Sequence, residues 1–325
     1  MARMTQAHLA AICARHAYPR VAVESGTYQG KTTRLILGFA PGGPIDFVAR
    51  VMTEQLGKEL GHAVIVENKP GANAGIAAEY VAKSAPDGLT LFMTSLGAVA
   101  ISPSLYDKLP YDPVRDFAPV TLVVSTAEVL VASASNPAST VPEFIANARQ
   151  KGDGATLASS GIGSVPHLAM ELLADVTKAN LRHVPYKGVA PAITDVIAGH
   201  VDAIFIDVPV ALAQIKAGKL KALGIAAPKR HPMLPDTRTL QEMGIAGVDS
   251  DNWYAIFAPK ATPAAEIERI GQAVRRTLEN DAVKQKLLAS GVEPAPTTPA
   301  QLGALLKSDS DKWARIIKLK GIKGE

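Results

Sequence analysis

Short apolar segments alternate with helix-like segments from Arg34 onward, and this alternation constrains the fold more than any other feature. RLILGF (34–39), AVIVEN (63–68) and LTLFMTS (89–95) have the composition of buried strands. Between the first two, residues 47–60 carry apolar side chains at helical spacing and end before a glycine. Strands that are apolar throughout and alternate with helices are covered on both faces. The pattern therefore predicts a parallel α/β sheet.

The same alternation repeats in the second half of the chain. A long apolar stretch at 120–134 predicts one long strand, and four further strands and four helices follow it: strands 155–160, 181–186, 201–207 and 219–227, and helices 141–151, 164–176, 189–199 and 209–217. A last strand (254–260) precedes C-terminal helices, the first of which begins after Thr262-Pro263.

A chain of 325 residues is too long for one compact core. The simplest assembly is two doubly wound α/β domains, with 31–118 plus 251–325 as the first and 119–250 as the second. The chain then crosses between the domains twice, near 118–122 and near 225–255, which predicts a hinge. Residues 1–30 have no clear period and no export-signal pattern, and we interpret them as a tail.

Composition excludes several classes of protein. The single cysteine, Cys13, excludes a disulfide framework and a cysteine-based zinc site. Aromatic residues make up 5% of the chain, and no dense Lys/Arg run accompanies the net charge of +4, so no nucleic-acid surface is expected. No stretch reaches the ~18 apolar residues that a membrane-spanning helix needs.

Two glycine-rich loops lead from predicted strands into predicted helices. In the first loop, FAPGGPID (39–46), Gly42 and Gly43 let the backbone approach a ligand, and Asp46 is placed to cap the helix. The second loop, SSGIGS (159–164), adds three serine hydroxyls. Neither loop contains Arg or Lys, so an anion would bind backbone N–H groups and hydroxyls. Lys187 is the nearest candidate charge, although a solvated lysine is the simpler interpretation.

Catalytic and metal sites have weaker support. Ser160 and His167 form a tempting pair, but a GxSxG motif and an acid to orient the histidine are both missing. The histidines lack metal-ligand spacing. Asp46 and Asp207 each follow a strand, one per domain, and proton transfer and hydrogen bonding to a ligand remain alternatives for that pair.

The motifs together resemble one known family. RLILGFAPGGPIDFVAR, VIVENKPGANAGIAAEYVAKSAPDGLTLFM, ASSGIGSVPHLAMELL and VPYKGVAPAITDVIAGHVDAIFID are similar to the Bug family of extracytoplasmic solute-binding proteins, the TctC-like receptors of tripartite tricarboxylate transporters. The resemblance covers 34–323. It implies a type II periplasmic-binding-protein fold without a cofactor or metal. Members of this family begin with an export signal, a pattern that residues 1–30 do not show.

The resemblance also implies a function and a site. A small carboxylated solute, either an amino acid such as aspartate or glutamate or a di- or tricarboxylate, is expected between the domains, for delivery to a membrane permease. We expect the protein to be periplasmic and monomeric, and we do not expect it to be an enzyme. Carried over by position, the ligand-binding residues are Phe39, Pro41, Gly43, Asp46, Ser95, Leu96, Ser160, Gly163, Ser164, His167, Tyr186 and Asp207. A sensory module on the same fold, or an enzyme that uses Ser160 and His167, are the alternatives.

Overall fold

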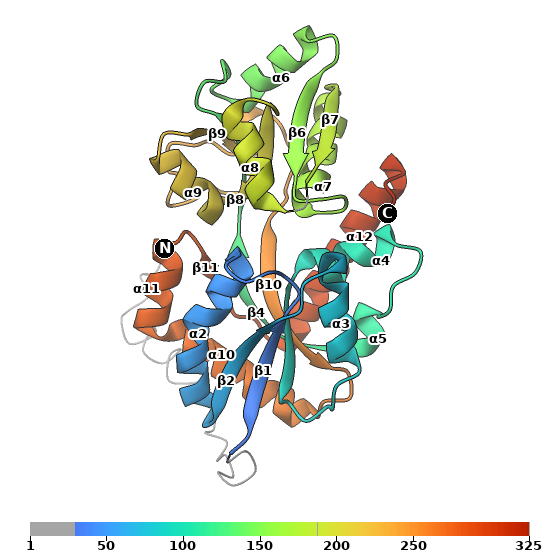
Figure 1. The fold of residues 1–325 in the computed structure, drawn as a ribbon, viewed down its shortest axis with the longest axis vertical. Coiled ribbons are helices and arrows are strands. Elements are labelled where there is room, and N and C mark those ends of the chain that lie inside the picture. Colours follow the sequence, from blue (N-terminus) through green and yellow to red (C-terminus); the bar gives the residue numbers. More distant parts are fainter. Residues whose placement is uncertain (1–29, 187, 325) are drawn as a thin grey trace, which may run out of the picture.

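The computed structural model describes residues 30–186 and 188–324. They form two lobes, and each lobe is built around one β-sheet (Figure 1). Helices cover both faces of each sheet. The predicted tail lies, except for Gly30, outside the described residues.

The described strands of the first lobe are β1 (Thr32–Leu37), β2 (Ala63–Asn68), β3 (Thr90–Ser95), β4 (Phe117–Thr126), β10 (Asn252–Pro259) and β11 (Glu293–Pro294). They are ordered β11-β4-β10-β3-β1-β2. β1 is parallel to β2 and β3, whereas β10 is antiparallel to β3 and β4. The helical segments are α2 (Pro44–Leu60), η2 (Ala72–Ala74), α3 (Gly75–Ala82), η3 (Gly97–Ile101), α4 (Ser102–Leu105), α5 (Pro113–Asp116), α10 (Ala264–Glu279), α11 (Asp281–Ala289) and α12 (Pro299–Lys320).

The described strands of the second lobe are β5 (Glu128–Ser133), β6 (Ala155–Ser159), β7 (Leu181–Pro185), β8 (Ala203–Asp207) and β9 (Leu220–Ile225). Their order is β7-β6-β8-β5-β9, with β6 parallel to β7 and β8. β5 is antiparallel to both of its neighbours. The helical segments are α6 (Val141–Gln150), α7 (Val165–Thr177), α8 (Val189–Ala198), α9 (Val208–Lys216) and η4 (Gln241–Met243).

Local sequence signals explain where the helices begin and end. α2 has Pro44 at its first position and stops at Gly61, whose φ of 78° is left-handed. Its buried face repeats at helical spacing through Val48, Met52 and Leu56. α12 starts with a capping box in which the side chains of Thr298 and Gln301 each bond the other residue's backbone N–H.

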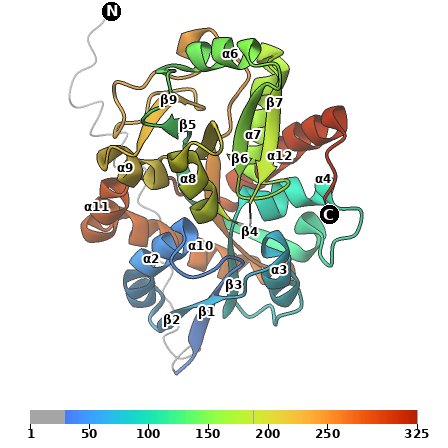
Figure 2. The ribbon, with the colours of Figure 1, turned by 45° about the horizontal axis from the view of Figure 1, so that its top comes forward.

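The hydrophobic core connects the two lobes. On one face of the first sheet, α2 and α10 pack over strand residues such as Leu35 and Leu37. The core on the other face continues into the second lobe, where Trp253 and Trp313 belong to the same cluster as Leu173. α12 contacts β4 and η3 of the first lobe as well as α7 of the second (Figure 2). This helix therefore bridges the lobes.

The predicted long strand at 120–134 is wrong. It is two strands, β4 and β5, which are separated by Ala127 and belong to different sheets. Both strands are mostly buried, so the apolar pattern shows no break where the chain changes sheet. The first crossing lies at Ala127 instead of 118–122, and the predicted boundary at 118/119 falls inside β4. The second crossing runs from Ile225 to Asn252.

The sheets are mixed, whereas the sequence predicted parallel ones. The antiparallel members β5 and β10 directly follow the two crossings, where the chain enters each sheet from the other lobe. Hydrophobicity on both faces indicates that a strand is covered but carries no information on its direction.

Phe117 offers a test of the first-lobe core. Its ring is 2% exposed and packs between Phe92 (centroids 5.5 Å apart), Tyr111 (6.1 Å) and Phe257 (6.4 Å). We expect Phe117→Ala to lower the free energy of unfolding by about 3–5 kcal/mol in urea titrations, because it leaves a cavity. Val114→Ala, at a side chain that is 71% exposed, is the control and should change it by less than about 0.5 kcal/mol. Equal effects of the two changes would contradict this packing.

Candidate functional site

The loops that follow the parallel strands of the two lobes face each other near the crossings (Figure 1). In open α/β sheets, ligands bind beyond the carboxyl ends of such strands. The lobes touch at this place. A Cβ added to Gly163 of the second loop would lie 2.0 Å from Leu105 Cδ2 of the first lobe. Gly163 has a φ of +73°, so glycine suits this position for two independent reasons.

Asp46 anchors the first loop. Its carboxylate is 3% exposed and accepts hydrogen bonds from Gly42 N–H (2.9 Å) and Arg50 Nε (2.8 Å) on Oδ2, and from Asn68 Nδ2 (3.0 Å) on Oδ1. The same Asn68 amide donates to Phe39 O. The hydrogen bond from Arg50 is the main cause that lowers the pKa of Asp46 to about 2. Because both oxygens have donors, Asp46 holds the loop and is not a free carboxylate.

The helices that follow the two loops have uncapped N-termini. Gly43 precedes α2 and Ser164 precedes α7, and neither makes a side-chain capping hydrogen bond. Each helix has a proline in its first turn, and this proline has no backbone N–H that needs a hydrogen-bond acceptor. The remaining N–H groups of the first turn have no partner within the helix, and the helix dipole adds positive potential there. Each lobe therefore presents a helix N-terminus of the kind at which anions bind in many proteins.

Two serine hydroxyls are available at the facing loops. Ser95 and Ser160 are half-buried, and within the described part of the chain neither hydroxyl has a hydrogen-bond partner. Ser164 differs, because its hydroxyl donates to Gly161 O (2.7 Å). Leu96, next to Ser95, is fully buried.

Phe39 and Gly43 are half-buried, and Pro41 is exposed. The ring of His167 is 5% exposed and accepts an N–H from Gly163. The hydroxyl of Tyr186 donates to Asp195 Oδ2 (2.5 Å) on α8, and its backbone N–H donates to Ser159 O (3.0 Å) at the start of the second loop. Lys187 lies outside the described residues.

Asp207 lies at the crossing, where it accepts hydrogen bonds from Tyr254 Oη (3.0 Å) and Asn252 Nδ2 (3.3 Å) of β10. Burial raises its pKa to about 6.

Sequence reasoning missed Glu128, which pairs with Asp207 across β5 and β8 and is 1% exposed. Burial, followed by the charge of Asp207, raises the pKa of Glu128 well above its usual value. A lone acid in the apolar run at 120–134 was the signal that could have found it.

A strained turn was also missed. Ala72, Asn73 and Ala74 all have left-handed φ angles of 49°, 48° and 69°, a conformation that costs a non-glycine residue about 1–2 kcal/mol. Asn73 Nδ2 donates to Ser102 Oγ (3.1 Å), and Ala74 fills the space beside Gly38. The sequence motif PGAN predicted a turn here but no link between the β1 and β3 loops.

The paired groups considered as catalytic do not meet. Asp46 and Asp207 have separate partners, and no hydrogen bond in the described chain joins Ser160 to His167. The described residues contain no cluster of His, Cys, Asp or Glu suited to a metal. None of their helices has the length and apolar character to cross a membrane. Two surface hollows, of about 280 Å³ beside β11 and about 360 Å³ along α3, lie away from these loops.

Comparison with known families decides the identity. The family model described as "Tripartite tricarboxylate transporter family receptor" matches residues 48–322. The chain belongs to this family. The resemblance noted in the sequence is thereby confirmed, and the family is one of solute-binding receptors.

Solved structures share the fold of this receptor. It is 31% identical to the periplasmic binding protein BugD, with a TM-score of 0.81 over 91% of this chain and 99% of BugD. It is 29% identical to an R. palustris protein with adipate, with a TM-score of 0.85 over 91% and 99% of the two chains. It is 33% identical to MatC from Rhodopseudomonas palustris with bound malate, with a TM-score of 0.79 over 89% and 99%. The predicted two-lobe periplasmic-binding-protein fold is confirmed.

The Asp46 anchor gives the receptor a measurable pH signature. We expect Asp46→Asn to lower the unfolding free energy by about 1–3 kcal/mol at neutral pH, because it weakens charged hydrogen bonds. The folded pKa of about 2 lies below the ordinary aspartate pKa of 3.8. The stabilisation is therefore complete above the unfolded value and is lost as pH falls through the folded one. Urea unfolding of both proteins across this range measures it, with Asp153→Asn as an exposed control. A difference that stays constant down to about pH 2 would contradict the anchor.

Proposed function

We propose that this receptor captures a small carboxylated solute between its lobes and delivers it to a membrane permease of the tripartite tricarboxylate transporter type. The observation that carries the proposal is the pair of uncapped helix N-termini, α2 and α7, one from each lobe. A carboxylate would accept hydrogen bonds there, each contributing about 1.5–3 kcal/mol for a charged group. Proximity to a helix N-terminus adds about 0.3–2 kcal/mol.

The proposed contacts divide into two groups. Backbone N–H groups of the two loops, together with the hydroxyls of Ser95 and Ser160, bind the carboxylate oxygens directly. A second group sets the shape of the loops and the crossing: Asp46, Leu96, Ser164, His167, Tyr186 and Asp207. Phe39, Pro41, Gly43 and Gly163 contribute backbone and surface beside the ligand.

The ligand class follows from the symmetry of the site and from the solved relatives. Each lobe offers one anion-binding helix end, which suits a solute with two acidic groups. Two solved relatives carry solutes with two carboxylates: one is described with adipate and the other with bound malate. Aspartate, glutamate and tricarboxylates present the same pair of carboxylates and belong to the proposed class.

Capture requires that the lobes close on the solute. A carboxylated ligand that contacts loops of both lobes stabilises the closed arrangement, and the two crossings act as the hinge. We place the receptor in the periplasm, because the similar solved proteins include periplasmic binding proteins. We further propose that it acts as a monomer.

Replacing Gly43 by leucine tests the site without disturbing the fold. A Cβ at Gly43 would meet only Ala40 O, at 3.6 Å, and its φ of −79° suits any residue. A thermal-shift screen of adipate, malate, aspartate, glutamate and citrate identifies a ligand, and calorimetry then measures the variant. We expect at least a tenfold weaker affinity with an unchanged melting temperature. Gly152→Leu, where the added Cβ meets nothing within 4 Å, is the matched control. Unchanged affinity of Gly43→Leu would remove the first loop from the site.

Ser160→Ala separates a receptor from an enzyme. We expect the variant to bind the identified carboxylate several-fold more weakly, because one hydrogen bond to a charged group is lost. Ser139→Ala, at an exposed serine that precedes α6 in the sequence and belongs to neither loop, should bind normally. Wild-type protein should return the solute unchanged after long incubation, as mass spectrometry can show. Turnover that Ser160→Ala abolishes would favour the catalytic alternative.

A further inference from the structure

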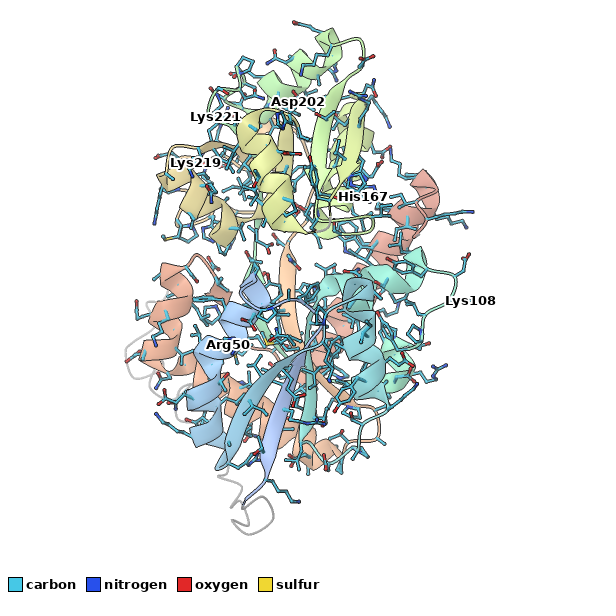
Figure 3. All side chains as sticks on the ribbon, viewed as in Figure 1. Arg50, Lys108, His167, Asp202, Lys219 and Lys221 are labelled. Atoms are coloured by element: carbon cyan, nitrogen blue, oxygen red, sulfur yellow. The ribbon has the colours of Figure 1, made fainter. Side chains whose placement is uncertain are left out.

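Two histidine rings stack directly under the second loop. His167, in the first turn of α7, and His183, in β7, have ring centroids 3.7 Å apart and planes that differ by 6°. His167 lies at the edge of the second lobe that faces the first lobe (Figure 3). The loop runs from β6 into α7. Its N-terminal end follows β6, which pairs with the strand of His183, and its C-terminal end leads into α7, the helix of His167.

His167 secures the C-terminal end of the loop. The N–H of Gly163 donates to His167 Nδ1 at 3.0 Å. An imidazole nitrogen accepts only through its lone pair, so this bond fixes the tautomer with the proton on Nε2. Nε2 lies 3.8 Å from Glu171 Oε1. The arrangement is similar to a capping box, with an imidazole as the side chain that reaches back to the start of the helix.

His183 secures the N-terminal end through Ser159. Its Nε2 lies 2.5 Å from Ser159 Oγ, a group that is fully buried. The same Oγ accepts the N–H of Gly161 (3.1 Å) and donates to Gly161 O (3.0 Å). A hydroxyl has one proton and two lone pairs, so all three bonds are satisfied when His183 donates its Nε2 proton. Ser159 and His183 therefore hold Gly161 by both of its backbone groups.

The loop needs such restraint. Gly161 has a φ of +137° and Gly163 has a φ of +73°. A glycine can adopt these backbone conformations, but many other backbone conformations are open to it at similar energy. Ordering each of these residues costs about 1–2 kcal/mol of backbone entropy. If the loop were loose, that cost would fall on ligand binding.

We propose that His167 and His183 are positioning residues, a stacked pair of neutral imidazoles that fixes Gly163 and Gly161 and so presents the second loop to the carboxylate. The proposal rests on the proposed function of the loop. Ser159 is the link between His183 and the loop, and Ser160 beside it is left to contact the solute.

Burial keeps both rings neutral. Burial, followed by the neighbouring His183, lowers the pKa of His167 to about 3, and burial lowers that of His183 to about 4. The charged group beside the rings is Glu171 on α7, with Oε1 3.8 Å from His167 Nε2. Lys320 on α12 and Asp175 on α7 act on Glu171 in turn and pair with each other at 3.3 Å. Rings kept neutral when folded give stability that is complete above the unfolded pKa of about 6.5 and is lost as pH falls toward the folded values.

The first test needs no ligand. Nitrogen-15 NMR of the histidine rings should show His167 with its proton on Nε2, and the amide of Gly163 should exchange slowly. His167→Leu should raise that exchange rate at least tenfold, whereas His167→Asn should largely preserve protection, because the asparagine Oδ1 takes the place of Nδ1. A proton on Nδ1 of His167, or equal exchange in the two variants, would overturn the proposal.

The second test measures binding, with malate as the first probe and adipate as the second. His167→Leu and Ser159→Ala should weaken affinity about tenfold when folded fractions are equal, and His167→Asn should restore it. His200→Leu, at an imidazole that is 72% exposed, is the matched control. Lower melting temperatures with unchanged affinities would show a purely structural stack and overturn the proposal. If wild type binds no carboxylate, the proposed function fails, and the NMR result still decides how the loop is held.

Discussion

The two chain crossings determine how the rest of the molecule is arranged. Glu128 O accepts the N–H of Ala226, and Ala226 O accepts the N–H of Ser250, so the outgoing and returning strands are held together where they leave one lobe for the other. β4 and β10 then pair as far as Thr126 and Asn252. Because β10 and β5 begin at this place and run antiparallel to β3 and β8, the carboxyl ends of the parallel strands in both lobes face one another. Any site built from those ends belongs to both lobes.

Acidic groups concentrate at the same crossing. Glu128 and Asp207 are opposite each other on adjacent strands, and the donors to Asp207 come from β10, a strand of the other lobe. Burial raises the pKa of both carboxyl groups, and the charge of Asp207 raises the pKa of Glu128 further. The hydrogen bonds that join the lobes at the crossing therefore involve a pair of carboxyl groups that is less ionised than two carboxyl groups with ordinary pKa values.

The proposed recognition of an anion without a cation explains why so many polar side chains near the loops already have hydrogen-bond partners. Asp46, Ser164 and His167 each bind backbone groups of a loop or helix start. Backbone N–H groups recognise a carboxylate only when they are held in a fixed direction, since they lack the long reach of an arginine. The polar residues therefore contribute rigidity, and the contacts proposed for the solute fall to the peptide backbone and to Ser95 and Ser160.

The sequence by itself determined the order of strands and helices, the two glycine-rich loops and the family, because hydrophobic periodicity and loop motifs are local properties. Tertiary structure decided where the chain changes sheet, since Ala127 lies inside an unbroken apolar run. It also decided the direction of β5 and β10, which depends on partners distant in sequence. The same holds for side-chain roles. Asp46 and His167 were expected at the ligand. Asn68, which donates to Asp46 Oδ1, and His183, which stacks on His167, lie 22 and 16 positions away in the sequence, so only folding shows that these two side chains already have partners.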